Sequence, residues 1–463
     1  MTLKELLHRR VPQFVGAYIV AGWGVVQFIQ FLENRYPMST IWVELVGLTW
    51  ILALPAVVSL AWHHGAPGRD PWTRGQIISL GANALTAVLI LFIAFGGGGG
   101  DAVSKTITVT DENGDELIRE VPRDQTQRRS LLLLFLDDDT GKNGATEPSH
   151  WLTRAIPFML LMDLTQDLFL DVRSPFLNKD LATRLGAPDA YDIPRALRRE
   201  VAERHHVNFY VTGTLRSAEP TEIEFVVYDT DTAREVQRKT FAGTPFSVTD
   251  DASRWARRVV GLPEAHIERA LDQPVADMLT DSIESIRTYV NGYSRAVIDG
   301  ELEAAHADFE QSVKADPTHA LAQFQLFTLA RVTRADQRDV ADVAMKAAMT
   351  HLNRLPDRMQ FLLKHFYYEN VFEAEKALAV LKLWAKLMPS DPMVHQLLAS
   401  TYQRRGEFEL AVEAMERVLE FFPGEPAVSN TLGELYESES QWDEAKKVYV
   451  RLTTVFPDDS LGY

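Results

Sequence analysis

The first hundred residues contain three long apolar runs separated by short polar loops. The runs cover residues 11–32, 41–62 and 77–95, and each has about the 20 residues that a helix needs to cross a bilayer. A signal peptide is a single short apolar segment with a cleavage site, so it does not explain three consecutive runs. Buried core helices are the other alternative. We predict that residues 1–95 form a transmembrane anchor of three helices whose partner is the lipid bilayer.

Basic residues in the short loops predict the orientation of this anchor. Lys4, Arg9 and Arg10 precede the first run, and Arg69 and Arg74 lie between the second and the third. Since short cytoplasmic loops are enriched in Lys and Arg, the N-terminus and the second loop are predicted to be cytoplasmic. The third run then carries everything after about residue 95 to the opposite side. In a bacterial inner membrane, that side is the periplasm.

After the anchor, the apolar pattern changes from long runs to short alternating segments. Residues 96–129 are predicted to be a linker that begins with Gly96–Gly100 and contains a β-hairpin, because Asn113-Gly114 lies between alternating strands. Residues 130–262 alternate between strands such as SLLLLFLD and EIEFVVYDT and segments of helical spacing. Strands separated by helices and then followed by consecutive strands predict an α/β domain with a mixed sheet.

From residue 368 onward, three residue types recur every 34 residues. The recurring residues are Tyr368, Ala377 and Pro389, then Tyr402, Ala411 and Pro423, then Tyr436, Ala445 and Pro457. A period in this range predicts a stack of repeated helical hairpins, in which proline ends the second helix and alanine permits close helix packing. Together with Leu432 and Gly433, which precede Tyr436, these marks resemble those of tetratricopeptide (TPR) repeats. We predict about five units in residues 263–463.

The resemblance to TPR repeats implies a groove lined by the first helix of each unit, and this groove binds proteins or peptides. By this resemblance, the groove residues of the two clearest units are Gln396, Gln403, Arg404, Asn430, Glu434 and Glu437. The chain ends soon after Pro457, where another helix would begin. Solenoids need polar capping elements at their ends. The position of this chain end therefore predicts a truncated chain, a docked partner or self-association through the last repeat.

The α/β segment also resembles a known domain. The stretch AERHHVNFYVTGTLR, followed by IEFVVYDTDTAREVQ, is similar to the N-terminal domain of the periplasmic protein TolB. Such domains occur between membrane anchors and TPR units in ToxR-like regulators and in membrane-bound cyclases or kinases. The resemblance implies a periplasmic, non-catalytic module. Relatives with cytoplasmic output carry an output domain ahead of the membrane, whereas about ten residues precede the first apolar run here.

Composition and motifs argue against several functions. The first hundred residues have six basic and four acidic side chains, so the remainder has 41 basic and 60 acidic ones, a net charge of −19. This disfavours nucleic-acid binding, which needs a basic surface. Cysteine is absent, and so are the common hydrolase, zinc-protease and phosphate-loop motifs. We predict a non-enzymatic protein without cofactor or metal.

Three further groups of residues have a structural interpretation. Asp137–Asp139 are interpreted as a solvated loop rather than a metal site, and His205-His206 as a charged cap at a helix end rather than a metal pair. Trp255 and Arg257-Arg258 are predicted to lie on a helix that packs the α/β domain on the repeats.

Two functions remain open at this stage. The first is a membrane-anchored periplasmic scaffold that binds partners through the groove. The second is the sensory subunit of a transmembrane complex whose output domain is a separate protein, with coupling through the helix face of Ala17 and Ala21.

Overall fold

The computed structural model describes most of the chain and divides it into two compact units, Met1–Lys105 and Thr106–Tyr463. The described residues are 10–35, 41–64, 73–95, 104–122, 128–140, 150–177, 179–187, 190–270, 272–333, 338–421 and 426–455. Several predictions concern residues outside these ranges: Lys4, Arg9, Arg69, Gly96–Gly100, Pro423 and Pro457.

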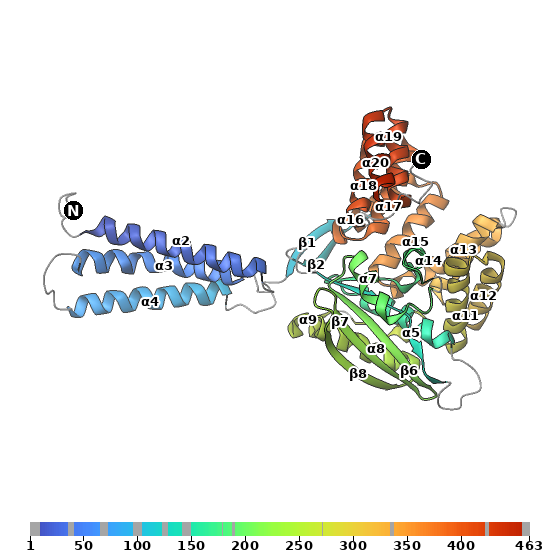
Figure 1. Cartoon of the computed structure of the whole chain (residues 1–463), viewed down its shortest axis with the longest axis horizontal. Helices are drawn as coiled ribbons and strands as arrows, with labels where there is room; N and C mark the ends of the chain where they lie inside the picture. Colours follow the sequence, from blue (N-terminus) through green and yellow to red (C-terminus); the bar gives the residue numbers. More distant parts are fainter. Residues whose placement is uncertain are drawn as a thin grey trace. The chain divides into compact units, whose positions relative to one another are not determined.

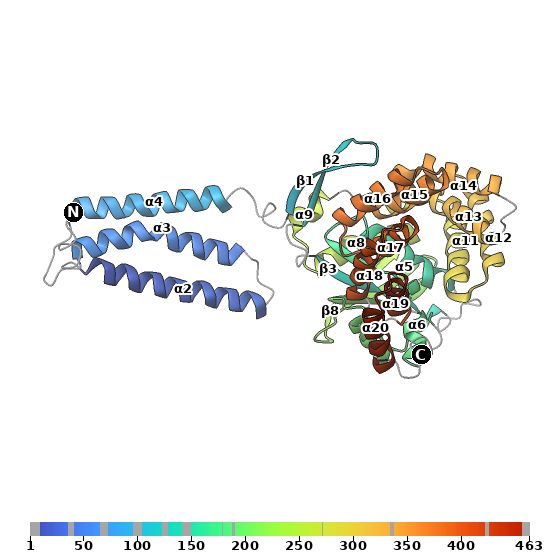
Figure 2. The same cartoon turned by 90° about the horizontal axis from the view of Figure 1, so that it is seen from above.

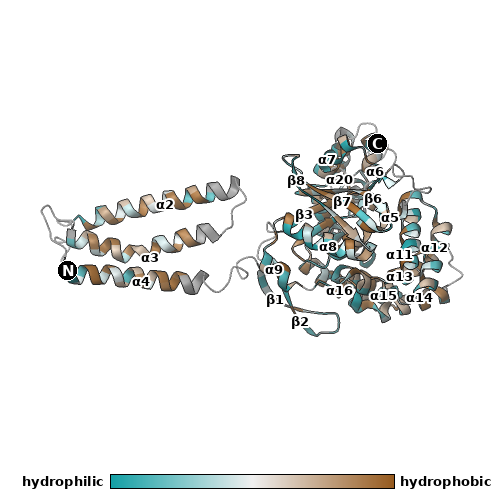
Figure 3. Cartoon of the chain, turned by 90° about the horizontal axis from the view of Figure 1, so that it is seen from below, coloured by the Kyte–Doolittle hydropathy of each residue, from teal (hydrophilic) through white to brown (hydrophobic). Residues whose placement is uncertain are grey.

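The first unit contains three helices that coincide with the three apolar runs. They are α2 (Val11–Arg35), α3 (Ile41–His64) and α4 (Arg74–Phe95). Apolar residues recur along all three (Figure 3), and many of their large apolar side chains are exposed. By length and composition, all three could cross a membrane. Within this unit, α2 packs on α3.

The contact between α2 and α3 depends on Gly22 of α2. A Cβ atom added to Gly22 would lie 2.0 Å from Nε1 of Trp50, so only glycine allows this approach. The hydroxyl of Tyr18 donates a hydrogen bond of 2.6 Å to the carbonyl oxygen of Trp50. Ala17 and Ala21 are exposed on α2. The contact between α2 and α3 therefore uses Gly22 and leaves Ala17 and Ala21 exposed.

The segment expected to be a linker contains a packed hairpin, β1 (Ser104–Thr110) and β2 (Glu116–Pro122). Asp111 stabilises its turn by accepting hydrogen bonds from the backbone amides of Asn113 and Asp115. The buried Glu112 side chain lies 2.7 Å from Nζ of Lys364 in the helical region. The hairpin is thus attached to the repeats by a buried ion pair.

The α/β region is built on a mixed sheet. Its strands are β3 (Arg129–Leu133), β4 (Asp137–Asp138), β5 (Leu170–Arg173), β6 (Phe209–Ala218), β7 (Thr221–Asp229) and β8 (Glu235–Gly243). The order is β5-β3-β6-β7-β8, and β4 also pairs with β6. Pairs among β3, β5 and β6 are parallel, whereas β6, β7 and β8 pair antiparallel. This matches the mixed sheet expected from the strand pattern.

Helices lie on both faces of this sheet. They are α5 (His150–Leu164), α6 (Lys179–Arg184), α7 (Arg195–Arg204) and α8 (Pro245–Val259), with short helices α9 (Glu264–Arg269) and α10 (Val275–Met278) following. The Trp255 ring lies 5.8 Å from that of Phe241 on β8, and α8 also contacts α5 (Figure 1). The expectation that α8 packs on the repeats is therefore wrong, since its apolar face covers the sheet.

Arg257 on α8 is the centre of a buried ionic cluster. Its guanidinium lies 3.1 Å from Asp163 and 2.6 Å from Asp272. Burial raises the pKa of Asp163 to about 7, and Arg257 opposes that shift. Arg257 therefore connects α5, α8 and the segment that leads to the repeats.

The C-terminal region consists of helical hairpins in chain order. The helices are α11 (Ile283–Ser294), α12 (Leu302–Ala315), α13 (Ala320–Thr333), α14 (Arg338–Thr350), α15 (Asp357–Asn370), α16 (Ala374–Leu387), α17 (Pro392–Arg405), α18 (Phe408–Phe421), α19 (Pro426–Ser438) and α20 (Trp442–Val455). Each hairpin contacts the next (Figure 2). Five hairpins are described, in agreement with the predicted number of units.

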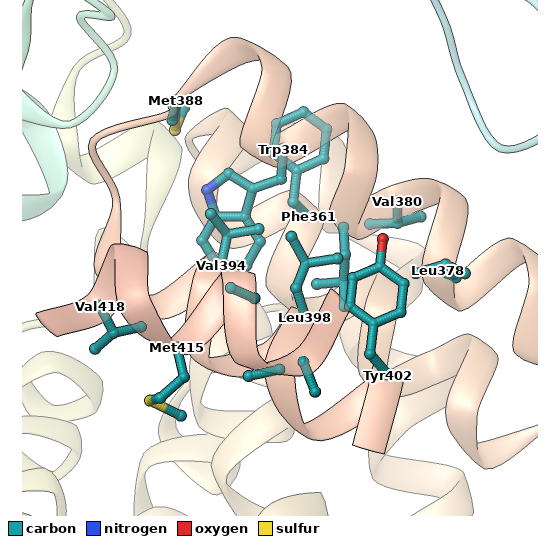
Figure 4. Packing of buried hydrophobic residues seen from close by; sticks show 14 of the residues in the cluster. Phe361, Leu378, Val380, Trp384, Met388, Val394, Leu398, Tyr402, Met415 and Val418 are labelled. Atoms are coloured by element: carbon teal, nitrogen blue, oxygen red, sulfur yellow. The ribbon is translucent and has the colours of Figure 1, made fainter. Parts of the chain in front are cut away.

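The recurring residues form the packed interior of these hairpins. Ala377, Ala411 and Ala445 are buried where the two helices of a unit meet. Trp384 is fully buried, and Val394 from the next hairpin lies in the same cluster (Figure 4). Small residues at the crossings and large ones between units explain the period of the sequence.

The turn between the two helices of a unit needs a left-handed residue. Gly300, Gly406 and Ser440 adopt φ values of 77°, 73° and 57° at this turn. Phe372 occupies the same place with φ 62°, and its side chain is 93% exposed. A bulky residue rarely adopts this conformation, so the third unit is locally strained.

A buried polar cluster stabilises the first unit of the repeats. Oγ of Ser285 lies 2.9 Å from Nδ1 of His319, and Oγ of Ser312 lies 3.2 Å from the same atom. All three side chains are fully buried. A serine next to a histidine can form a nucleophile, but no substrate could reach this pair, so we assign it to packing.

Truncating Trp384 is expected to destabilise the repeats strongly. The change Trp384→Ala should cost about 3–5 kcal/mol, because it removes a fully buried ring between two units. Urea unfolding of the full chain in detergent micelles, followed by circular dichroism, measures this loss. The matched control is Trp442→Ala, where the side chain is 63% exposed and the change should be within about 0.5 kcal/mol. Equal effects of the two changes would contradict the assigned packing.

Stability should also depend on the ionisation of His319. Burial lowers the pKa of His319 to about 4 from an ordinary value of 6.5. Between these values the unfolded chain binds the proton more strongly, so stability falls as the pH decreases from 6.5 to 4.5. This one group should account for about 2 kcal/mol of that loss. In His319→Gln, the loss of unfolding free energy between pH 6.5 and 4.5 should be smaller by this amount, and an unchanged loss would show that His319 does not titrate as assigned.

Candidate protein-binding surface

The first hairpin of the repeats is covered by the α/β domain. Phe158 on α5 lies 5.1 Å from Tyr289 and 5.9 Å from Tyr293, both on α11, between ring centroids. Phe176, which precedes α6, lies 4.9 Å from Tyr293. Aromatic clusters of this kind bury large areas and add directional ring contacts. The first helix of the first hairpin is therefore covered from within the chain.

Polar contacts around the aromatic cluster support the same packing. Nη2 of Arg154 donates to Oδ1 of Asn291 at 3.4 Å, and the hydroxyl of Tyr191 donates to Asp299 at 3.1 Å. Nζ of Lys179 donates to the carbonyl oxygen of Ile298. Three segments of the α/β domain therefore attach to the first hairpin.

An ionic cluster connects the edge strand β5 with the middle hairpins. Arg358 at the start of α15 donates to Asp391 at 2.5 Å, and Nε1 of Trp384 donates to the same carboxylate at 3.1 Å. Burial alone would raise the pKa of Asp391, but Arg358 holds it below its ordinary value. Asp171 and Arg173 of β5 line a cavity of about 40 Å³ together with Arg358 and Asp391. The α/β domain thus also lies against the middle hairpins.

The predicted groove residues lie beyond this covered part, on α17 and α19. Five of the six are exposed and Asn430 is half-buried: Gln396, Gln403, Arg404, Asn430, Glu434 and Glu437. Nη2 of Arg404 lies 2.9 Å from Glu369 on α15, and Asn430 donates to Glu434 at 2.7 Å. The structure brings Arg404 and Glu369 together across neighbouring units, whereas the residues on α19 form a separate acidic group.

Sequence reasoning missed two features of this surface. The first is the ion pair between Glu369 and Arg404. In the sequence, only the 34-residue period could have identified Glu369 as a position of the unit that precedes Arg404. The other is an open cavity of about 250 Å³ on the last hairpin, lined by Glu437, Trp442, Ala445, Lys446, Tyr449, Val450 and Thr453. Exposed Trp442 and Val450 lie about two turns apart on one face of α20.

The two groups considered as metal sites have other roles. Asp137 and Asp139 form ion pairs with Arg198 at 2.5 Å and with Arg216 at 2.8 Å. They are half-buried, so the interpretation as a solvated loop is wrong. Among the described residues, no three His, Asp or Glu side chains gather as metal ligands.

His205 is also different from the expected charged cap. It is the residue at the C-terminal end of α7, as predicted. However, burial lowers its pKa to about 4, so the imidazole is neutral at physiological pH. Desolvation of the ring outweighs the attraction of a cation to the end of the helix.

Comparisons with known proteins agree with the helical architecture. The family model described as "Tetratricopeptide repeat" matches residues 394–424, which cover most of α17 and all of α18. No curated protein sequence matches the chain.

Solved structures, two of them described as TPR proteins, are similar to part of this chain. MamA from Desulfovibrio magneticus RS-1 is 18% identical, covers 38% of this chain and 98% of its own, and has a TM-score of 0.30. YrrB, described as a TPR protein with an unusual peptide-binding site, is 17% identical, covers 39% of this chain and 92% of its own, and has a TM-score of 0.28. TTC0263 from Thermus thermophilus is 21% identical, covers 38% of this chain and 93% of its own, and has a TM-score of 0.32. The family model of the tetratricopeptide repeat thus matches one hairpin of this chain, in phase with the recurring residues.

Proposed function

We propose that this protein is a membrane-anchored scaffold that binds a protein or peptide partner on the exposed faces of α17 and α19. The observation that carries the proposal is the unequal covering of the repeats. The α/β domain packs against α11 and the start of α15, while the first helices of the last two hairpins keep polar side chains exposed. In a stack of hairpins, these first helices are the surface available to a partner.

The charges on this surface favour a basic partner segment. Arg404 is already paired with Glu369, while Glu434 and Glu437 on α19 are exposed acidic side chains. The four groups therefore carry two excess negative charges. Gln396 and Gln403 offer amide donors and acceptors beside them. A peptide with Lys or Arg near its centre would complement this arrangement.

The membrane placement is part of the proposal. Three apolar helices of sufficient length support anchoring in a bacterial inner membrane, and the basic loops favour a cytoplasmic N-terminus. The α/β domain and the repeats would then be periplasmic, as the resemblance to the TolB N-terminal domain implies. The open cavity beside Trp442 supports a further contact at the last hairpin. Self-association of two copies of the chain through this hairpin is one such contact.

A second candidate function is the sensory subunit of a transmembrane complex. It is favoured by the exposure of Ala17 and Ala21 on α2, since small residues one turn apart allow a helix of another protein to approach closely. This function requires a cytoplasmic output protein that contacts the anchor. The two functions differ in where the partner binds.

Charge reversal at Glu434 is expected to weaken the partner complex. In Glu434→Lys, the new ammonium group would repel a basic partner segment, and the hydrogen bond that Asn430 donates to this carboxylate would be lost. We expect at least about a tenfold loss of affinity, the size of effect typical of a contact in an interface. The measurement is crosslinking in native membranes, co-purification and quantification of each partner against wild type.

The matched control is Glu420→Lys on α18, which makes the same change of charge and breaks an exposed pair with Arg417 at 3.0 Å. Both variants should keep the wild-type melting temperature within about 2 °C, because exposed polar contacts contribute little. If Glu420→Lys loses the same partners, the surface on α17 and α19 is not the binding site. If a cytoplasmic protein is retained by both variants, the sensory function replaces the scaffold.

The proposed orientation has a direct test because the chain lacks cysteine. Single cysteines at Ser39, Gly68 and Asn113 place a reactive thiol in the first loop, the second loop and the hairpin turn. A membrane-impermeant maleimide applied to intact spheroplasts should label positions 39 and 113 and leave position 68 unlabelled until the cells are lysed. Labelling of Gly68→Cys in intact spheroplasts would contradict the orientation.

A further inference from the structure

The α/β domain contains a polar cavity of about 300 Å³ on the face of the sheet opposite α8. Alternate residues of β6 form its floor: Tyr210, Thr212, Thr214 and Arg216. Successive residues of a strand point to opposite faces, which explains why Val211 and Leu215 are buried in the apolar core instead. Asp137 and Asp139, α7, β7 and β8 supply the other lining residues.

Four arginine side chains converge on this cavity from three different elements. Arg195 and Arg198 come from α7, Arg216 from β6 and Arg238 from β8. Three carboxylates also line it, those of Asp137, Asp139 and Glu224. The lining therefore carries one excess positive charge, although residues 101–463 together have a net charge of −19. A local cationic site in so acidic a chain is not explained by the average composition.

The arginines are held in place by the carboxylates. Arg198, which is 7% exposed, donates to both oxygens of Asp137 and from Nε to the carbonyl oxygen of Ile193. Arg216 lies 2.8 Å from Asp139 and 3.2 Å from Glu224. These pairs orient the guanidinium planes before any ligand arrives, and pre-organised arginines bind anions with little loss of side-chain entropy.

Hydrogen-bond donors outnumber acceptors in the lining. Arg195 has a side chain that is 82% exposed, and its Nη2 lies 3.4 Å from Asp137, a long contact for a charged pair. Most of its N–H groups face outward from this contact. Hydroxyls of Thr212, Thr214 and two stacked tyrosines, Tyr210 and Tyr228, add further donors. Such a lining is complementary to a ligand rich in acceptor oxygens.

A solvated sheet face could also be polar, but two observations favour a binding site. Tyr210, Thr212 and Thr214 are at most 9% exposed, so the floor is recessed rather than open. The paired carboxylates are only 20–23% exposed. Partly desolvated ion pairs cost folding free energy, and a role in ligand binding would account for keeping them. The volume is that of a small molecule with about the size of a sugar phosphate or a tricarboxylate.

We propose that this cavity binds a small molecule through a phosphate or carboxylate group. The anion lies between Arg195 and Arg216 above the threonines of β6, and the arginines donate to it in the planar, bidentate manner that suits both groups. Ligand binding would stabilise the α/β domain, because only the folded chain presents these donors together.

Calorimetric titration of the full chain in detergent micelles tests this site. The probes are inorganic phosphate and citrate, each added at constant ionic strength maintained with chloride. Saturable binding is expected for at least one probe below about 10 mM. Phosphate alone would identify a phosphate-bearing ligand, and citrate alone a carboxylate-bearing one. No saturable heat with either probe would overturn the proposal.

Variants locate the site and separate binding from folding. Arg195→Ala should weaken the affinity at least about tenfold, and its exposed position leaves the melting temperature unchanged. Thr214→Val tests the floor with a side chain of similar shape and should weaken binding about threefold. Arg254→Ala on α8, on the other face of the sheet, is the control and should bind as wild type does. Equal affinities in wild type and Arg195→Ala would place the anion elsewhere and overturn the assignment.

Discussion

A helical hairpin of this kind cannot bury its apolar surface alone, and the arrangement of Thr106–Tyr463 follows from this constraint. In the repeats, each hairpin covers one face of the next. The first hairpin has no preceding unit, and α5 of the α/β domain packs on α11 instead. The rings of Phe158, Tyr289 and Tyr293 supply the contact. The α/β domain is therefore the N-terminal cap of the solenoid as well as a module with its own cavity.

This capping decides where partners could bind. A free TPR solenoid would offer the first helices of all its hairpins, whereas here β5 and α5 occupy the region of α11 and the start of α15. The exposed faces of α17 and α19 remain available to a partner. The same domain presents its arginine-lined cavity on the sheet face opposite α8, so protein binding and anion binding would use separate surfaces.

Sequence periodicity predicted the elements well because it depends on local geometry. The apolar runs became α2, α3 and α4, and the alanines of the 34-residue period became helix crossings. Contacts between distant segments could not be predicted in this way. Trp255 was expected to face the repeats, but the strand β8 provides Phe241 for it. Asp137 and Asp139 were expected to be solvated, because nothing in their neighbourhood reveals Arg198 and Arg216, which are 61 and 77 residues away.

The contact between Phe158 and the first hairpin is the central claim, and hydrogen–deuterium exchange of Phe158→Ala tests it most directly. Removing the ring takes away contacts with both tyrosines of α11. If the α/β domain caps the solenoid, amide protection should fall together in α5 and α11 and stay unchanged in α19 and α20, which lie at the other end of the stack. Full protection of α11 in this variant would contradict the account, because the first hairpin would then be stable without its cap.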